Sequence, residues 1–355
     1  MVVWPQELLE AFVGQIPDKI TLQRCSLASK SLVVASQRRL FHSVSVKDRT
    51  SIRRATQQFT AFPHLRPYVK ELDVTSSEST TELKELASLL HMFPDVTRIK
   101  WSGFEWPKFL VTALKESLQN PSMQSFTLMV CDDVPPSLLS HAAASVSQLT
   151  LWHVTLNDRA GPAAEVIPSS QLRHLSHNIA SMMGKHDTIL PLLPHLSGLE
   201  KLEDDLSSVS EFKLIMEASH ETLKKLYLRR LDLPKLAHIS RTPPMHSLRV
   251  LDVSFVYASS KLCILALFSA LPPPMSIPHL ETLSMYIGPA DTVPVPQTAA
   301  SGLREILDAH GELRTFHVEL GWRRSRAGLL SLAEYIRAQT PTRIRVSGSI
   351  SKQSG

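Results

Sequence analysis

The sequence predicts an α/β protein, in which a short N-terminal helical module precedes strand–turn–helix repeats that share one parallel sheet with helices on its outer side. Two observations predict the repeats. An apolar-x-x-apolar-x-apolar unit recurs from Val69 to Val346, and segments with helical apolar spacing, such as residues 83–90, separate its copies. The third observation is the apolar pattern of the first 46 residues, which predicts short helices before the repeats.

The first 46 residues carry three apolar stripes with the spacing of short amphipathic helices. Pro5 suits a first helical turn, where its missing N–H would be unpaired in any case, and Pro17 with Asp18 separates the first helix from the second. Helices this short cannot bury all their apolar side chains on one another, so we expect the surplus surface to bind another protein. The stripes contain Leu8, Leu9, Phe12, Val13 and Ile16, then Leu22, Cys25 and Ala28, then Leu32, Ala35, Leu40 and Phe41.

The segment WPQELLEAFVGQIPDKITLQRCSLASKSLVVASQRRLFHSVSV, which ends at Val46, resembles an F-box. It departs from the family pattern at Trp4 and Leu32, where Leu and Trp are usual. The resemblance implies that residues 1–46 bind a Skp-type adaptor and, through it, cullin. An ordinary amphipathic helical cap on a larger domain is the alternative. The matching positions are Pro5, Glu7, Leu8, Leu22, Cys25, Ser26, Leu27, Lys30, Leu40 and Phe41, and the side chains expected to insert into the adaptor are Pro5, Leu8, Leu9, Leu22, Cys25, Leu27, Leu40 and Phe41.

Residues 47–63 are polar and basic and are expected to form a connecting helix or linker, whereas the repeats occupy residues 64–351 and residues 352–355 form a tail. Successive copies begin 27, 27, 23, 26, 27, 24, 25, 32 and 33 residues apart, and most of these steps are typical of leucine-rich repeats. This part resembles the repeats that follow the F-box in many substrate receptors. The two longest steps are expected to contain loop insertions, around residues 272–274 and from 288 to 302.

The solenoid is expected to be irregular. The Asn or Cys that closes many leucine-rich repeats is present only as Cys131. In the fifth and sixth repeats, His177 and Asp204 fall at positions that should be buried. We therefore expect that the strand register slips there, or that the sheet is locally disrupted.

Composition places the chain among globular proteins with a sizeable core. It has 355 residues, 43% hydrophobic residues and a mean hydropathy of −0.02, with no apolar run long enough for a membrane span and no signal-peptide pattern. The odd set of Cys25, Cys131 and Cys263 favours a reducing compartment, so we expect a cytoplasmic or nuclear protein. The net charge of +5 is dispersed, and its densest cluster, residues 323–326, is short, so nucleic-acid binding is not expected.

Catalytic signatures are missing from the sequence. It has no phosphate-binding glycine loop, no Cys-x-x-Cys and no His-Glu-x-x-His, so we expect neither a cofactor nor a metal site. The neighbouring His174, His177 and His186 are expected to be ordinary surface or core residues. Cys131 with His153 suggests a nucleophile and its base, but the repeat pattern makes Cys131 a buried, turn-packing thiol. An enzyme is therefore the least favoured class.

The residues between the apolar positions of each strand point to the opposite face of the sheet. Large aromatic residues and Arg on such a face are typical of protein interfaces, so we expect Trp152, Tyr227, Arg229 and Tyr286 to bind a client protein. With the F-box resemblance, this implies a non-catalytic substrate receptor of a cullin–RING ubiquitin ligase, which would act by holding its client close to the ubiquitin donor. An adaptor-independent interaction scaffold is the alternative.

Overall fold

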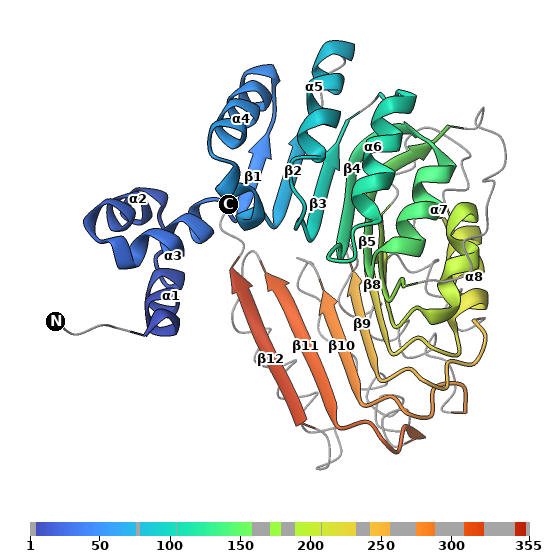
Figure 1. Cartoon of the computed structure of the whole chain (residues 1–355). Coiled ribbons are helices and arrows are strands. Elements are labelled where there is room, and N and C mark those ends of the chain that lie inside the picture. Colours follow the sequence, from blue (N-terminus) through green and yellow to red (C-terminus); the bar gives the residue numbers. More distant parts are fainter. Residues whose placement is uncertain are drawn as a thin grey trace. The chain divides into compact units, whose positions relative to one another are not determined.

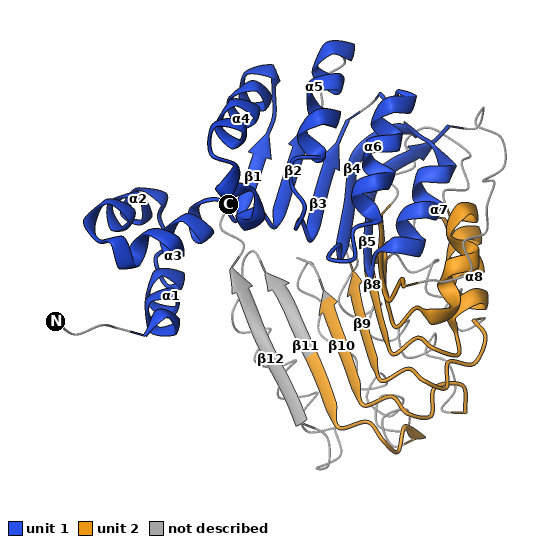
Figure 2. Ribbon diagram, in the orientation of Figure 1, with its two compact units in different colours: residues 1–168 blue, residues 169–355 orange. Residues whose placement is uncertain are grey.

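The computed structural model describes residues 5–75, 79–103, 105–157, 171–178, 189–206, 208–231, 242–255, 275–287, 309–322 and 345–352. The chain forms two compact units, unit 1 with residues 1–168 and unit 2 with residues 169–355 (Figure 2). Each unit contains a run of parallel strands that pair in the order of the sequence. The predicted α/β class with a parallel sheet is therefore confirmed.

Unit 1 begins with three short helices and continues as a ladder of parallel strands, with helices α4 to α7 on one side of the strands (Figure 1). Its elements are α1 Gln6–Gly14, α2 Lys19–Ala28, α3 Lys30–Leu40, β1 Ser43–Val46, α4 Arg49–Ala61, the 3-10 helix η1 Pro63–Tyr68, β2 Glu71–Thr75, α5 Thr80–Leu90, β3 Arg98–Ser102, α6 Lys108–Leu118, β4 Ser125–Val134, α7 Pro136–Ser145 and β5 Gln148–Leu156.

Polar caps set the beginnings of the early helices. The Asp18 carboxylate accepts a hydrogen bond of 2.7 Å from the backbone N–H of Thr21 at the start of α2. Asp48 and Ser51 form a reciprocal capping box at the start of α4, which lies in the segment predicted as a connecting helix or linker. The sheet itself begins earlier than residue 64, because β1 pairs in parallel with β2.

The apolar skeleton of the repeats forms the core of unit 1. In the register of the ladder, Leu72 lies opposite Ile99, Ile99 opposite Phe126 and Phe126 opposite Leu149. All four side chains are buried. The helices α5, α6 and α7 add buried leucines to the same layer, so the spacing in the sequence predicts both the strands and the helix faces that cover them. These leucines are Leu83, Leu86, Leu89, Leu90, Leu110, Leu114, Leu118, Leu138 and Leu139.

Unit 2 continues the same pattern of parallel strands, with α8 and the 3-10 helix η2 between the early ones (Figure 1). Its elements are β6 His174–Asn178, η2 Leu190–Gly198, β7 Lys201–Asp204, α8 Val209–Ser219, β8 Lys225–Leu231, β9 Val250–Phe255, β10 Thr282–Ile287, β11 Thr315–Trp322 and β12 Arg345–Lys352. The predicted loop insertions around 272–274 and from 288 to 302, the basic cluster 323–326, Cys263 and His186 lie outside the described residues.

The expected irregularity at His177 and Asp204 was wrong. Strand β6 pairs with β7 without a shift, and His177 lies directly opposite Asp204. Both side chains are buried, and the His177 Nδ1 and Asp204 Oδ2 atoms are hydrogen-bonded at 3.0 Å. The two polar residues satisfy each other across the ladder, which removes the reason for a slip.

Candidate interaction surfaces

The three N-terminal helices enclose a very small core. It consists of the buried Val13, Ile16, Leu22 and Ala35, with Cys25, Leu32 and Leu40 packed around it and half-buried. Leu22 corrects the predicted adaptor-binding set, because its side chain is 3% exposed and points into the bundle. Cys25 and Leu40 offer only part of their surface, since each also packs against this core.

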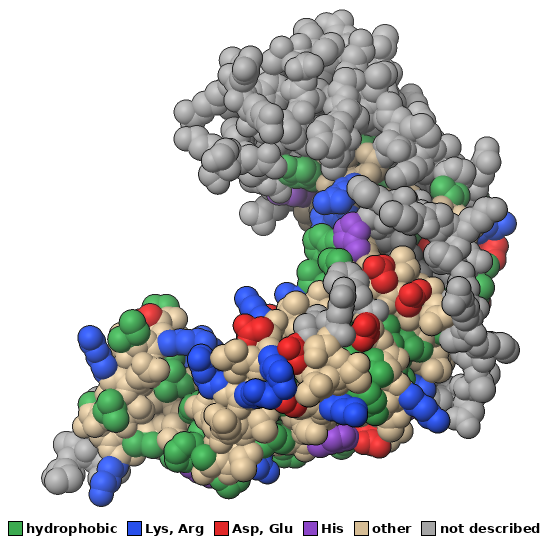
Figure 3. Space-filling view, turned by 90° about the horizontal axis from the view of Figure 1, so that it is seen from above, with side chains coloured by type: hydrophobic (Ala, Val, Ile, Leu, Met, Phe, Trp, Pro, Cys, Tyr) green, Lys and Arg blue, Asp and Glu red, His purple; other side chains and the backbone are tan. Residues whose placement is uncertain are grey.

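Hydrophobic side chains lie at several places on the outer surface of the three helices, among polar and charged ones (Figure 3). Among the predicted adaptor-binding residues, Pro5 is exposed, Leu9 is half-buried, and Leu8 and Leu27 are 52% and 87% exposed. The predicted adaptor-binding set did not include three further exposed residues, although the first apolar stripe contains Phe12, which lies one turn from Leu8 on α1. They are Phe12 and Ile20, each 61% exposed, and Val34, 39% exposed.

Phe41 also corrects the prediction, because a later part of the chain covers it. Its ring lies 6.0 Å from that of Phe59 on α4, in an edge-to-face arrangement, and Phe59 packs in the same way at 4.9 Å on Phe93. Arg38 of α3 lies 5.9 Å from the ring of Tyr68 in η1. Phe41 therefore joins the bundle to the first repeat, and only part of its side chain remains for a partner.

The residues predicted to point away from the core lie in straight rows across the strands. In unit 1, Asp73, Lys100, Thr127 and Thr150 are successive partners. In unit 2, the row is Ser176, Glu203, Tyr227, Asp252, Ser284 and His317. None of these side chains is buried. The rows confirm the sequence-based assignment of outward positions.

Two of the four predicted client-binding residues form one cluster in unit 2. Two cations lie over the ring of Tyr227, with Lys201 Nζ at 4.8 Å and the Arg229 guanidinium at 5.7 Å from the ring centre. Arg229 Nε is 3.2 Å from a carboxylate oxygen of Glu203, and its Nη1 is 3.7 Å from one of Asp252. Partial burial, followed by the charge of Asp252, raises the pKa of Tyr227. The charges of this cluster therefore largely neutralise one another.

The other two predicted client-binding residues, Trp152 and Tyr286, lie on strands that do not carry Tyr227 or Arg229. Tyr286 is on β10, opposite Ser254 of β9, and is half-buried. Trp152 is on β5 of unit 1 and is 40% exposed, with its ring stacked on that of His153 at 6.0 Å. Trp152 is thus an exposed residue, whereas Tyr227, Arg229 and Tyr286 are half-buried.

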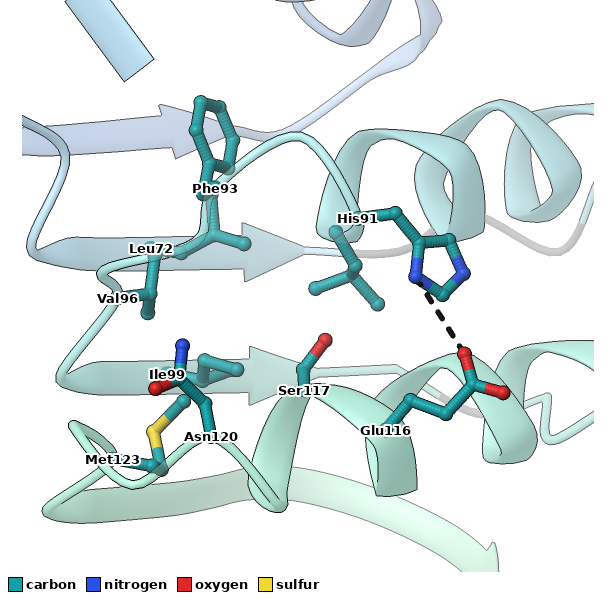
Figure 4. Close-up of a pocket in the computed structure, with 10 residues that line it drawn as sticks. Leu72, His91, Phe93, Val96, Ile99, Glu116, Ser117, Asn120 and Met123 are labelled. Carbon is teal, nitrogen blue, oxygen red and sulfur yellow. Dashed lines mark ion pairs between the residues drawn. The ribbon is translucent and has the colours of Figure 1, made fainter. Parts of the chain in front are cut away.

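A small cavity of about 170 Å³ opens between the C-terminal ends of α5 and α6 and strands β2 and β3 (Figure 4). His91 and Glu116 form an ion pair of 3.6 Å beside it. Its volume is below the roughly 300–1,000 Å³ of typical small-molecule sites, so it suits at most one side chain. Apolar side chains predominate in the lining, which contains Leu72, Leu90, His91, Phe93, Val96, Ile99, Glu116, Ser117, Asn120 and Met123.

Cys131 lies in the core, as the repeat pattern predicts. Its thiol is fully buried and lies 3.6 Å from the carbonyl oxygen of Trp101 and 3.4 Å from that of Met129. Burial raises the pKa of this thiol to about 11, so it is not ionised at neutral pH. Among the described residues, no group of three or more His, Cys, Asp or Glu side chains is arranged to hold a metal ion.

The surfaces described above belong to an α/β protein of parallel strands whose leading helices expose apolar side chains. No family model matches the chain, and no curated protein is similar to it at a significant level. In the part of the chain that the structure describes, no helix has the length and apolar character needed to cross a membrane.

Proposed function

We propose that this chain is the substrate-recognition subunit of an SCF-type cullin–RING ubiquitin ligase. In this proposal residues 1–46 are an F-box that binds a Skp-type adaptor, and the leucine-rich-repeat-like part binds the client. The observation that carries the proposal is the exposure of Leu8, Phe12 and Leu27 on the same three helices that carry the F-box-like sequence. The protein would act in the cytoplasm or nucleus.

The exposed side chains suit a docking function for energetic reasons. Burying a Leu, Phe or Ile side chain from water contributes about 1.5–3 kcal/mol, so an uncovered set on one small bundle is a large driving force for association. Among the described residues, the buried core of the bundle consists of Val13, Ile16, Leu22 and Ala35, which is too small to cover the exposed side chains as well. Helices of a partner that pack onto this surface would complete the core, as in other helix-in-groove complexes.

The proposed mechanism requires no covalent step in this chain. The adaptor and cullin would hold the protein near the ubiquitin donor, and the client would be held on the outward face of the strands. Tethering of this kind raises the effective concentration of the client lysines to the order of millimolar. The buried, un-ionised thiol of Cys131 is consistent with a receptor that binds rather than reacts.

Co-expression with a Skp-type adaptor tests the proposal. Deletion of residues 1–46 is unsuitable, because it would remove β1 from the sheet and Phe41 from its contact with Phe59. Leu8→Asp combined with Leu27→Asp instead changes only exposed positions, and should abolish co-purification of the adaptor. Phe62→Asp is the matched control, since Phe62 is also 52% exposed but lies at the end of α4.

Two outcomes would separate the proposal from the alternative of an adaptor-independent scaffold. If the wild-type chain does not co-purify with the adaptor, or if the Leu8→Asp, Leu27→Asp variant binds as the wild type does, the docking claim is wrong. If the adaptor binds and a bound partner accumulates in cells when this variant replaces the wild type, the receptor function is supported. Unchanged partner abundance would favour the scaffold.

A further inference from the structure

Strands β4 and β5 each present two consecutive outward residues instead of one. The buried Leu128 and Cys131 are three positions apart, as are Leu151 and Val154 in the next strand. The residues between them are Met129 and Val130 on β4, and Trp152 and His153 on β5, with Met129 opposite Trp152 in the register. We call these four residues the Trp152 patch.

The Trp152 patch is apolar, accessible and held in a fixed shape. Val130 and Trp152 are 48% and 40% exposed, and the stacked rings of Trp152 and His153 are inclined by 28°. Val130 and His153 have φ angles of 52° and 53°, a left-handed conformation that is rare for a β-branched residue. The fold therefore maintains this strained step in two adjacent strands and thereby keeps apolar side chains at the surface.

Acidic side chains border the patch where β4 ends. Asp132 and Asp133 follow Cys131, and Glu105 precedes Trp106, whose indole N–H donates a 2.7 Å hydrogen bond to the Asp132 carbonyl oxygen. All three carboxylates are on exposed residues. An Oδ1 atom of Asp132 accepts a hydrogen bond of 3.1 Å from the Thr155 hydroxyl.

This edge has no basic side chains from its own strands. The chain contains 38 Lys and Arg residues, yet residues 116–158, which include β4, α7 and β5, contain none. Among the described residues, the carboxylates of Glu105 and Asp133 form no ion pair. A basic protein thus carries a local acidic border where β4 ends, next to the Trp152 patch.

We infer that the Trp152 patch binds a segment of a partner protein in which an apolar side chain is adjacent to Lys or Arg. The apolar side chain would cover Trp152 and Val130, and the cation would lie over Asp132 and Asp133. The acidic border rejects acidic segments and nucleic acid, because like charges repel at close range. The inference rests on the proposed receptor function, since it names the chemical class of the client for that surface.

Fluorescence anisotropy with the full-length chain tests this inference. The probe is a labelled peptide in which Leu alternates with Lys between Ser-Gly spacers. Two comparison peptides replace every Lys with Glu or every Leu with Ser, and both should bind at least about tenfold more weakly. Raising the salt from about 0.1 M to about 1 M shortens the Debye length from about 10 Å to about 3 Å, and should weaken binding of the Lys peptide.

Variants locate the binding to the patch. Trp152→Ala should weaken binding of the Lys peptide at least about tenfold, as expected for a central aromatic contact residue. Asp132→Asn combined with Asp133→Asn should weaken it about threefold to tenfold and reduce its salt dependence. Asp95→Asn is the control, because Asp95 is a half-buried acid of unit 1 that pairs with Lys70 and precedes β3, at the opposite end of the strands.

Several outcomes would overturn the inference. They are equal affinity for the Lys and Glu peptides, unchanged affinity in Trp152→Ala, and a dimer in light scattering that Trp152→Ala converts to a monomer. The proposed receptor function fails separately. If the wild-type chain binds the Lys peptide but no Skp-type adaptor, the receptor proposal is wrong and the inference about the Trp152 patch is supported. If Trp152→Ala still binds the adaptor but no longer binds the Lys peptide, both the receptor proposal and the inference are supported.

Discussion

The buried pair of His177 and Asp204 allows a quantitative test of the fold of unit 2. The two side chains, each 2% exposed, occupy positions that the following strands fill with Leu228 and Val253. Removing one partner of a buried ion pair leaves an uncompensated polar group, which typically costs about 3–5 kcal/mol. We expect Asp204→Leu and His177→Leu each to lower the free energy of unfolding by this amount.

The double variant should cost much less than the sum of the two single variants. Once His177 and Asp204 are both Leu, neither leaves the other unpaired, and the apolar layer of the neighbouring strands is extended. Some loss remains, because the Leu206 N–H loses its acceptor at 2.5 Å and Glu211 loses the His177 nitrogen at 3.8 Å. An unsatisfied buried donor costs about 1–3 kcal/mol. The two single losses add to about 6–10 kcal/mol. The double variant should keep only the residual loss, so the two substitutions should be coupled by at least about 3 kcal/mol.

Urea unfolding followed by far-ultraviolet circular dichroism measures this coupling in a double-mutant cycle. His177→Leu with Leu283→Ala is the control cycle, because Leu283 lies on β10 and does not pair with β6. Its two effects should add within about 0.5 kcal/mol. Additive effects in the His177 and Asp204 cycle would show that the two side chains do not depend on each other, and would refute the pairing that keeps the strand register continuous.

Three further predictions follow from burial and charge. Burial alone lowers the pKa of His177, but the hydrogen bond and charge of Asp204 raise it above 6.5 overall. Protonated His177 therefore stabilises the folded state; this contribution is complete below pH 6.5 and is lost as the pH rises through the folded-state pKa. His177→Gln should therefore cost more stability at pH 6 than at pH 8 in urea titrations, and equal losses would contradict this. In a Cys263→Ser background, a thiol reagent at pH 8 should modify half-buried Cys25 before Cys131, whose pKa is about 11, and equal rates would contradict the burial of Cys131. Val13→Ala should lower the stability of the bundle by about 1–3 kcal/mol, whereas Leu27→Asp should change it by no more than about 0.5 kcal/mol, as measured by thermal melting.

The repeat pattern predicted the sheet well because its cause is local. Apolar residues two and three positions apart give a strand one buried face, and the same spacing in each copy aligns Leu72, Ile99, Phe126 and Leu149 across the ladder. The pairing of His177 with Asp204 could not be predicted in this way. Each is a polar residue at an apolar position, and only the register shows that they meet.

The N-terminal surface was predicted less completely, because the rotation of each helix about its axis depends on how the three helices pack. Apolar spacing identified the stripes, but it could not predict that Leu22 is buried while Leu27, on the same helix, is 87% exposed. Nor could it show that Phe41 packs on Phe59, since that contact joins the bundle to α4. The apolar stripes predicted exposed apolar side chains on these helices, and the structure shows which side chains they are.

A left-handed backbone step gives three of the strands a second outward side chain. Val130, His153 and Arg230 occupy the same place in three strands, and all have φ near +52° although none is glycine. Leu206, just after β7, has the same φ, but its side chain is buried. Each of Val130, His153 and Arg230 follows another outward residue and precedes a buried one, so the left-handed step inserts a second outward side chain without disturbing the core. Because the step tolerates Val, His and Arg alike, its side chains are free to differ between repeats while the inward positions stay apolar. The choice of partner is therefore expected to depend on these paired positions more than on the single alternating ones.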